Sequence, residues 1–202
     1  MAKVLIYLPV HRTVEAMNTL SLLELQKHEL LKGENEIAIN FLVGESLIPR
    51  ARNTIANKFL RSDYDYLLMI DSDLIFEKDT LERLLKHDKE LVGANYVHKT
   101  GITKWAGKAD DNLTSLSPAS FIPTGMMLIK KSVLHAIKDY VPVYATSMST
   151  LEYGFFNCMI ENNIYLSEDW SFSRRCEKAK IKGYIDNTIR LGHIGSFIYK
   201  GF

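Results

Sequence analysis

Two aspartates separated by a single residue are the clearest sign of chemistry in this 202-residue sequence. Asp71 and Asp73 directly follow an apolar run, within the stretch LLMIDSDLIF at 67–76. Residues i and i+2 of an extended segment project to the same side, so both carboxylates could face one cation. Oxygen ligands favour Mg²⁺ or Mn²⁺, which usually completes its shell with water and a substrate phosphate. The alternative is that Asp71 caps a turn and Asp73 is a solvated loop residue.

Two arginines in the segment IPRARN, at 48–53, are candidates for binding an anion. If a helix begins near Pro49, Arg50 and Arg52 lie in its first turn, where the helix dipole disfavours cations. Helix N-termini and guanidinium groups both bind phosphate, and Arg52 is the preferred candidate for that role. The alternative is that one or both arginines pair with surface carboxylates.

Two later segments carry further titratable groups. Glu168 and Asp169 follow Ser167, a potential helix cap. Acidic residues in a first helical turn are ordinary helix design, but one of them could be a general base or stabilise positive charge in a substrate. His193 lies in the segment GHIG, at 192–195, where it could approach a metal closely. A single histidine is more often structural or exposed.

The elements that must position these residues alternate between strand and helix patterns. Near-continuous apolar runs of the kind that buried strands need occur four times in the first half, at 3–10, 36–43, 65–70 and 90–97. Helical patterns separate them, starting near Thr13, Pro49 and Asp79. For the first helix we expect the inward face to consist of Ala16, Leu20, Leu23 and Leu30.

This order predicts a single α/β domain over 1–202, with a mostly parallel central sheet flanked by helices and a less regular C-terminal half. In such sheets ligands bind outside the carboxyl ends of the strands, where Asp71 and Asp73 fall. Pro9, His11 and Arg12 reach the same edge from the first strand. The aromatic and small polar residues of 140–156 are interpreted as a mobile loop.

Composition limits the partners. The net charge of +1 comes from 25 basic and 24 acidic residues, which predicts no nucleic-acid or membrane partner. No apolar run has the length of a membrane-spanning helix. Cys158 and Cys176 are interpreted as reduced thiols, so we expect a cytoplasmic protein.

Taken in order, these segments resemble the nucleotide-sugar-dependent glycosyltransferases of the GT-A fold. The resemblance covers nearly the whole chain, and its segments are VLIYLPVHR, RARNTIANKFLRSDYDYLLMIDSDLIF, FIPTGMMLIKKSVL, SEDWSFSRRCEKAKIKGYID and LGHIGS. Its strongest parts are Asp71-Ser72-Asp73, which matches the family's DXD motif, and the pair Glu168-Asp169. A narrower comparison is with the small viral enzymes that glycosylate capsid protein.

The resemblance implies a metal-dependent glycosyltransferase, either a hexosyl- or a pentosyltransferase. It would move a sugar from a nucleotide-diphosphate sugar, a UDP-sugar in preference to a GDP-sugar, to a glycan or protein-linked acceptor. Residues 1–100 would form the nucleotide-binding half and 101–202 the acceptor-binding half. A viral enzyme would act in the host cytoplasm. The sugar, the acceptor, the stereochemistry and the oligomeric state stay open.

The resemblance also implies roles for individual residues. Mn²⁺ or Mg²⁺ would be held by Asp71, Asp73 and His193. The nucleotide sugar would be contacted by Pro9, Val10, His11, Arg12, Arg52, Asp71, Ser72 and Gly125. Asp169, with Glu168 beside it, would be catalytic. Acceptor contacts are expected from Lys99, Trp105 and Tyr153, because aromatic faces suit sugar rings. A tight strand start equally explains Gly125, and a place in the core equally explains Trp105.

Two other functions compete with this one. Phosphatases of the haloacid dehalogenase type also carry an apolar strand that ends in D-x-D, with the first aspartate as nucleophile. In them the motif lies near the start of the core fold, whereas here two strands precede it. The other alternative is a nucleotide-sugar-binding module whose catalysis has lapsed, which turnover of a nucleotide sugar would distinguish.

Overall fold

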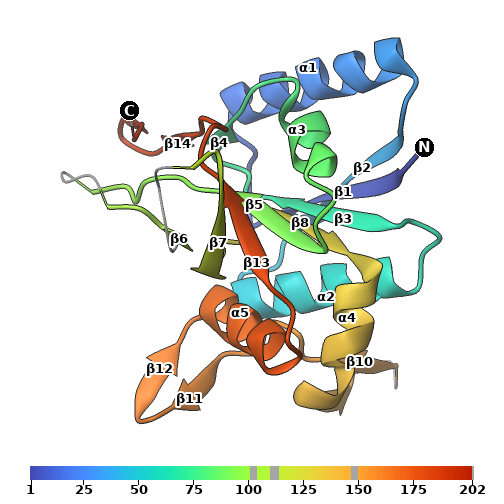
Figure 1. Ribbon diagram of the computed structural model, residues 1–202, viewed down its shortest axis with the longest axis vertical. Coiled ribbons are helices and arrows are strands. Elements are labelled where there is room, and N and C mark those ends of the chain that lie inside the picture. Colours follow the sequence, from blue (N-terminus) through green and yellow to red (C-terminus); the bar gives the residue numbers. More distant parts are fainter. Residues whose placement is uncertain (101–103, 110–113, 147–149, 202) are drawn as a thin grey trace.

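An eight-stranded sheet forms the centre of the computed structural model, which describes residues 1–100, 104–109, 114–146 and 150–201 (Figure 1). Its strand order is β2-β1-β3-β8-β5-β13-β7-β6. The bounds of these strands are β1 (Lys3–Val10), β2 (Glu36–Val43), β3 (Tyr66–Ile70), β5 (Leu91–Ala94), β6 (Lys108–Ala109), β7 (Leu116–Phe121), β8 (Met126–Lys130) and β13 (Gly183–Asp186).

Helices and smaller sheets complete the fold. The helices are α1 (Ala16–Lys32), α2 (Ile48–Leu60), α3 (Thr80–Lys86), α4 (Lys131–Ile137), the 3₁₀ turn η1 (Lys138–Tyr140) and α5 (Glu168–Lys178). A three-stranded sheet joins β4 (Leu74–Ile75), β14 (Gly192–Ile194) and β15 (Ile198–Tyr199). Two hairpins pair β9 (Val143–Ala145) with β10 (Leu151–Tyr153), and β11 (Met159–Glu161) with β12 (Ile164–Leu166).

The α/β fold with helices flanking a central sheet is confirmed, and all four strands expected in the first half are present. Strand β1 runs parallel to both β2 and β3. Strand β8 lies antiparallel between β3 and β5, so β3 and β5 run in the same direction. The sheet is therefore mixed, because apolar runs identify buried strands without encoding the direction in which they pair.

Two hydrophobic layers hold the helices on opposite faces of the sheet. Helices α1 and α3 cover one face, and α2, α4 and α5 cover the other (Figure 1). The alternation of β1 shows the division, since Ile6 and Leu8 pack in the first layer whereas Leu5 and Tyr7 pack in the second. Every residue of β1 from Val4 on is consequently buried.

The predicted inward face of α1 is wrong. Its buried residues are Asn18, Ser21, Leu22, Leu25 and Glu29, whereas Ala16, Leu20, Leu23 and Leu30 are exposed. Two hydrogen bonds set this orientation of α1: the Asn18 amide donates to the Asp71 carbonyl, and the Ser21 hydroxyl accepts from the Phe76 N–H. The helix turns these hydrogen-bonding side chains inward, so the pattern of leucines gives its orientation wrongly. Helix α1 also begins later than the start expected near Thr13, because Glu15 is its N-cap and Ala16 its first residue.

The mobile-loop interpretation of 140–156 is wrong for the described part of that segment. Strands β9 and β10 form an antiparallel hairpin there. Phe155 and Phe156 are fully buried, and the ring of Phe156 stacks on that of Phe172 with centroids 4.4 Å apart. Residues 147–149 lie outside the described residues. Burial of two aromatic side chains fixes the end of the segment under α5.

Within the described ranges, no helix is both long and apolar enough to cross a membrane. Cys158 and Cys176 are both free thiols, the first half-buried and the second buried.

Candidate active site around the aspartate pair

A pocket of about 350 Å³ opens where β1 and β3 end. It is lined by Pro9, His11, Glu45, Ser46, Ile48, Arg52, Asp71, Ser72, Asp73 and Glu168. Seven of the residues expected to bind donor or metal, or to act in catalysis, thus share one cavity: Pro9, His11, Arg52, Asp71, Ser72, Asp73 and Glu168. The carboxyl ends of neighbouring parallel strands meet at one sheet edge, which brings together segments far apart in the sequence.

Backbone hydrogen bonds fix the turn that carries the aspartates. The Asp71 N–H donates to the Gly125 carbonyl at 2.9 Å, and the Ile194 N–H donates to the Asp73 carbonyl at 2.8 Å. From α1, the Asn18 amide donates to the carbonyls of Asp71 at 3.0 Å and Leu74 at 2.7 Å. Three different segments therefore hold the turn in place from its backbone.

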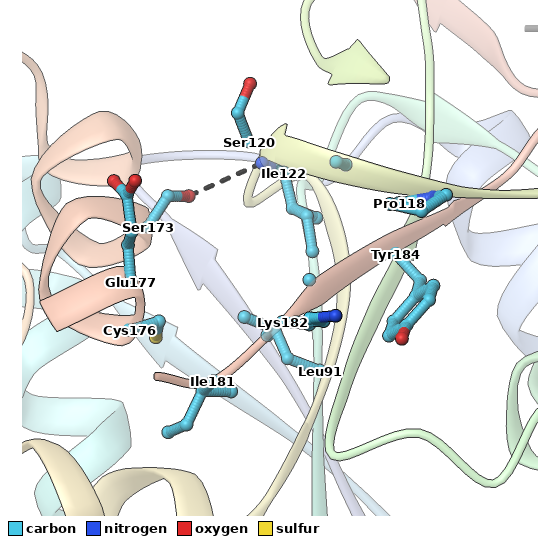
Figure 2. Close-up of a pocket in the computed structure, with 12 residues that line it drawn as sticks. Leu91, Pro118, Ser120, Ile122, Ser173, Cys176, Glu177, Ile181, Lys182 and Tyr184 are labelled. Atoms are coloured by element: carbon cyan, nitrogen blue, oxygen red, sulfur yellow. Dashed lines mark hydrogen bonds between the residues drawn. The ribbon is translucent and has the colours of Figure 1, made fainter. Parts of the chain in front are cut away.

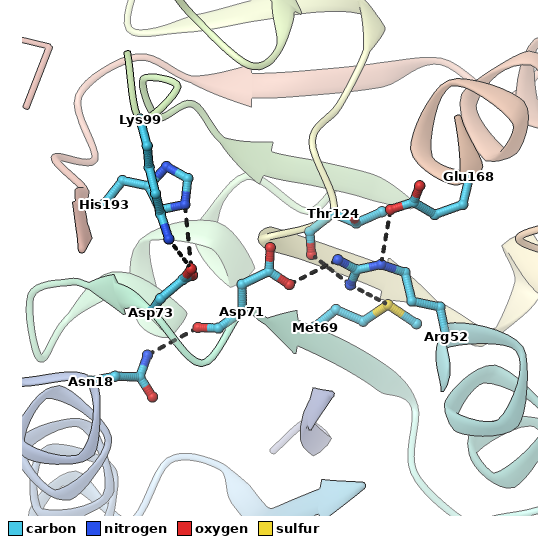
Figure 3. A network of polar contacts seen from close by, with 9 residues as sticks. All are labelled: Asn18, Arg52, Met69, Asp71, Asp73, Lys99, Thr124, Glu168 and His193. Carbon is cyan, nitrogen blue, oxygen red and sulfur yellow. Dashed lines mark hydrogen bonds and ion pairs between the residues drawn. The ribbon is translucent and has the colours of Figure 1, made fainter. Parts of the chain in front are cut away.

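Arg52 is the partner of Asp71. Its Nη2 donates to Asp71 Oδ1 at 2.8 Å, and its Nη1 lies 3.4 Å from the Thr124 carbonyl oxygen (Figure 3). Helix α2 begins at Ile48, so Arg52 lies near the helix start, as expected. Arg50, two residues earlier, is exposed and pairs with Glu45. Arg50 therefore pairs with a carboxylate at the surface, which was the alternative for both arginines. Arg52 does not, because it is buried and only 2% exposed.

Glu168 brings the start of α5 to the same arginine. Its Oε1 lies 3.5 Å from Arg52 Nε, a buried atom that makes no hydrogen bond within the described residues. Burial favours loss of the arginine's proton, but the charges of Asp71 and Glu168 outweigh it and raise the pKa of Arg52. Burial likewise raises the pKa of Glu168, with Asp169 adding to the effect and Arg52 opposing it.

Asp73 has a different set of neighbours. Lys99 Nζ lies 2.5 Å from Asp73 Oδ2, and His193 Nε2 lies 3.6 Å from the same oxygen (Figure 3). Burial pushes the pKa of Asp73 up, but hydrogen bonding and charge from His193 and Lys99 outweigh it, so this pKa is lowered. The carboxylate is therefore ionised and already faces a cation.

The backbone selects the tautomer of His193. Its Nδ1 lies 2.8 Å from the Val97 carbonyl oxygen, which can only accept, so Nδ1 carries the proton. In the neutral ring, Nε2 then keeps its lone pair on the side of Asp73, where a metal ion could use it. In the charged ring, Nε2 also carries a proton, and this is the form that lowers the pKa of Asp73. Metal-binding histidines are usually oriented by a hydrogen bond of this kind. Among the residues that the structure describes, however, no three His, Cys, Asp or Glu side chains are grouped closely enough to hold a metal.

Asp169 is held by its own helix turn. Its Oδ1 accepts from the Trp170 N–H at 2.8 Å and from the Ser167 hydroxyl. The ring of Trp170 stacks on that of Phe121, with centroids 4.3 Å apart. Glu168 is committed to Arg52, whereas the hydrogen bonds of Asp169 are local.

Eight of the expected site residues do not line the pocket: Val10, Arg12, Lys99, Trp105, Gly125, Tyr153, Asp169 and His193. Lys99 and His193 lie beside Asp73, Gly125 binds the backbone of Asp71, and Asp169 follows Glu168 in the chain. The other four lie elsewhere. Val10 packs in the core, and Arg12 is exposed. Trp105 lines a different pocket, beside Asn95 and Asp186, and its ring lies against Gly201. Tyr153 packs against Phe155 beneath the sheet, and its carbonyl accepts from the Asn57 amide.

Gly125 is required by a neighbour that sequence reasoning missed. A Cβ on Gly125 would lie 2.5 Å from the hydroxyl oxygen of Tyr96. Tyr96 is almost fully buried, and its ring contacts that of His193 at 5.1 Å between centroids. Burial raises the pKa of Tyr96, and the charge of Asp71 adds to this. The only signal for it in the sequence is its place just after β5, another strand that ends at this edge.

A second pocket, of about 330 Å³, lies at the opposite edge of the sheet, where β5 and β13 begin (Figure 2). Leu91, Ile122 and Ile181 give it apolar walls, and the Ile122 N–H donates to the Ser173 hydroxyl at 3.4 Å. None of the residues expected to bind donor, metal or acceptor, or to act in catalysis, lines it.

Comparisons with known proteins identify the fold. No protein-family model and no curated sequence matches the chain. A structure of GalNAc-T7 with UDP, GalNAc and Mn²⁺ aligns with a TM-score of 0.51 and 11% identity. The alignment covers 96% of this chain and 44% of the GalNAc-T7 chain. A Drosophila β1,4-galactosyltransferase 7 mutant with manganese, UDP-Gal and xylobiose aligns with a TM-score of 0.52 and 16% identity, covering 96% and 71%.

A bacterial structure aligns equally well. S. aureus TarS, residues 1–349, in complex with UDP, has a TM-score of 0.52 and 13% identity, with 92% of this chain and 58% of its own covered. A glycosyltransferase involved in glycosylating the major capsid of PBCV-1 aligns over 65% of this chain with a TM-score of only 0.38, too low to assign a relationship. The chain thus spans less than half of the GalNAc-T7 structure, and it has the GT-A fold that these glycosyltransferases share.

Proposed function

We propose that this chain is a metal-dependent glycosyltransferase that takes a sugar from a nucleotide-diphosphate sugar, a UDP-sugar in preference to a GDP-sugar. The acceptor would be a glycan or a protein-linked sugar. The observation that carries the proposal is the pocket at the ends of β1 and β3, where Asp71, Asp73 and Arg52 face one cavity. Two carboxylates and a buried guanidinium suit a ligand made of a divalent cation and a diphosphate.

The residues present fit a divalent ion by their chemistry. Asp73 offers oxygens and His193 offers Nε2, the nitrogen left free by its bond to Val97. Asp71 keeps Oδ2, since its Oδ1 is bound to Arg52. We assign Mn²⁺ or Mg²⁺ to these three side chains, although only Asp73 and His193 already lie close together and Asp71 would have to approach them. When bound, the ion would neutralise the charge that develops on the departing diphosphate.

Arg52 supports an anionic ligand in its own right. Its Nε is buried without a hydrogen-bond partner among the described residues, and an unmade hydrogen bond of this kind costs about 1–3 kcal/mol. Arg52 also lines the pocket, so its guanidinium charge would attract a phosphate bound there. Pro9, His11 and Ser72, which line the same cavity, would then contact the nucleoside part of the donor.

For the catalytic carboxylate we favour Asp169 over Glu168. Glu168 faces Arg52 and offsets its charge, so its role is to position the arginine. Asp169 is adjacent, at the start of α5, and would either take a proton from the acceptor or stabilise positive charge on the sugar. Trp170, partly exposed and stacked on Phe121, provides an aromatic surface beside it. Lys99, Trp105 and Tyr153 remain predictions as acceptor contacts, and a cytoplasmic location remains a prediction as well.

The test is turnover of a panel of UDP- and GDP-sugars with Mn²⁺, followed as release of UDP or GDP. Slow hydrolysis of one donor would support the transferase, and Asp169→Asn should lower this rate far more than donor affinity. Glu168→Gln should weaken donor binding as well as turnover. Tight binding without hydrolysis would indicate the lapsed module instead. Release of phosphate from a phosphate monoester, lost in Asp71→Asn, would indicate a phosphatase.

A further inference from the structure

The lysine on Asp73 contacts an oxygen that a metal ion bound by this carboxylate would also use. Lys99 Nζ lies 2.5 Å from Asp73 Oδ2, and this is the oxygen nearest to His193 Nε2. An ammonium group and a divalent cation cannot share that oxygen without strong mutual repulsion, since like charges a few ångströms apart repel by several kcal/mol at an effective dielectric of about 20. The geometry therefore contains a competitor for the metal.

The setting of Lys99 makes it exchangeable. Its side chain is 35% exposed and that of Asp73 is 29% exposed, so the pair is in contact with solvent. An ammonium on a flexible four-carbon stem can leave such a partner at little cost. By contrast, the Arg52 side chain on Asp71 is 3% exposed and is also held by Thr124.

A glycine makes room for this lysine. A Cβ on Gly195 would lie 3.0 Å from Lys99 Cδ and 3.2 Å from a ring carbon of Tyr199. Such contacts are tight, so a side chain at 195 would require the lysine stem or the Tyr199 ring to shift by a few tenths of an ångström. The absence of a side chain at Gly195 thus leaves room for the stem of Lys99.

We propose that Lys99 is a resident counter-cation that competes with the divalent ion for Asp73 and thereby sets the metal affinity of the site. This inference rests on the proposed function, because it takes Asp73 as a metal ligand. While the ion is absent, Lys99 neutralises Asp73 and keeps the carboxylate in place beside His193. Binding of the ion requires Lys99 to withdraw, which weakens the apparent affinity for metal.

The test is a calorimetric titration of the full chain with Mn²⁺ alone, without nucleotide. Lys99→Met removes the competing charge and keeps a side chain of similar length, so the Mn²⁺ affinity should rise about tenfold or more, equivalent to about 1.4 kcal/mol. Lys104→Met is the matched control, because Lys104 is an exposed lysine on the same segment. Its loss should change the affinity less than about twofold, since exposed charges at a distance are screened.

A second variant changes geometry and leaves the net charge unaltered. Gly195→Ala should displace the Lys99 stem and raise the Mn²⁺ affinity, by less than Lys99→Met does. In the double variant, Gly195→Ala should add nothing, because the lysine it acts on is gone. Thermal unfolding in EDTA verifies that each variant is folded.

Unchanged or weaker Mn²⁺ binding by Lys99→Met would overturn the inference. The same conclusion would follow if neither the wild type nor Lys99→Met bound Mn²⁺ while both bound UDP, and the donor site itself would then stand. If neither the wild type nor any variant bound UDP, with or without Mn²⁺, both the inference and the proposed function would fail. Equal gains in Lys99→Met and Lys104→Met would assign the effect to general charge and would also refute a specific competitor.

Discussion

The two aspartates of the pair are only one residue apart, yet the protein treats them differently. Asp71 is bound to Arg52, a buried arginine that also faces Glu168 and a backbone carbonyl. Asp73 is bound to Lys99, a partly exposed lysine, with His193 nearby. One carboxylate is thus part of a buried ionic network, and the other has a partner that can leave.

A single turn thus carries one carboxylate whose partner is fixed and one whose partner can be displaced. A planar guanidinium donates several hydrogen bonds in fixed directions and keeps its charge when buried, which suits the Asp71 side. An ammonium group is a mobile point charge that water readily accommodates, which suits the Asp73 side. The proposed binding and release of a cation and a nucleotide would use both kinds of partner.

The largest effect should come from Arg52→Met. Asp71 and Glu168 would be left without their buried partner, and breaking a buried ion pair in this way costs about 3–5 kcal/mol of unfolding free energy. The matched control is Arg50→Met in the same helix, where the exposed pair with Glu45 should contribute about 1 kcal/mol or less. Urea denaturation of both variants measures the contrast. Similar losses in the two variants would refute the view that Arg52 is structural.

Asn18→Ala should have the next largest effect. The side chain is fully buried and donates to two carbonyls of the aspartate turn, so its loss leaves those acceptors unpaired at a cost of about 1–3 kcal/mol. Leu20→Ala, an exposed leucine in the same helix, should be close to neutral, within about 0.5 kcal/mol. If the leucine variant were the less stable of the two, the orientation of α1 described above would be wrong.

Lys99→Met should affect stability far less than it affects metal binding. Because both partners are partly exposed, the pair should contribute no more than about 1 kcal/mol to the free energy of unfolding. Measured in EDTA beside Arg52→Met, this variant tests the comparison directly. A loss as large as that of the arginine variant would mean that the Asp73 side is as rigid as the Asp71 side.

The smallest effect concerns pH and Glu168. Its pKa is raised, mainly by burial, so the folded state binds this proton more tightly than the unfolded state does. The resulting stabilisation is complete below the unfolded pKa and is lost as pH rises through the folded pKa. Relative to Glu168→Gln, the wild type should therefore lose stability as the pH rises from about 4.3, the ordinary pKa of glutamate, towards neutral pH. Melting temperatures of both proteins across this range provide the measurement, and an opposite trend would mean that Arg52 dominates over burial.

Much of the fold was predictable because its strands are unusually apolar. The runs that became β1, β3 and β5 are buried on both faces, and the apolar pattern located them. The same pattern located β2, although this strand lies at the edge of the sheet and has no fully buried residue. The orientation of α1 was not predictable in this way, because Asn18 and Ser21 face inward and form hydrogen bonds to a turn 55 or 56 residues later. Hydrophobic periodicity carries no information about such long-range hydrogen bonds.

The candidate site was predictable where it lies at strand ends and less so elsewhere. Asp71, Asp73 and Pro9 were expected at one edge, and they share a pocket. The partner of each aspartate was not expected, since Arg52 and Lys99 come from separate segments and pair only in the folded chain. Tyr96 was missed because a tyrosine after a strand has no signature beyond its position.

The central claim is that the pocket at Asp71 and Asp73 binds a nucleotide diphosphate together with a divalent ion. It is tested most directly by calorimetric titration with UDP and GDP, with and without Mn²⁺, on the wild type and on Asp73→Asn. Asp63→Asn, which changes an exposed aspartate, serves as the control. We predict that one nucleotide binds in a Mn²⁺-dependent manner, and that this dependence is lost in Asp73→Asn and kept in Asp63→Asn. Binding of neither nucleotide, or metal-dependent binding unchanged in Asp73→Asn, would contradict the claim.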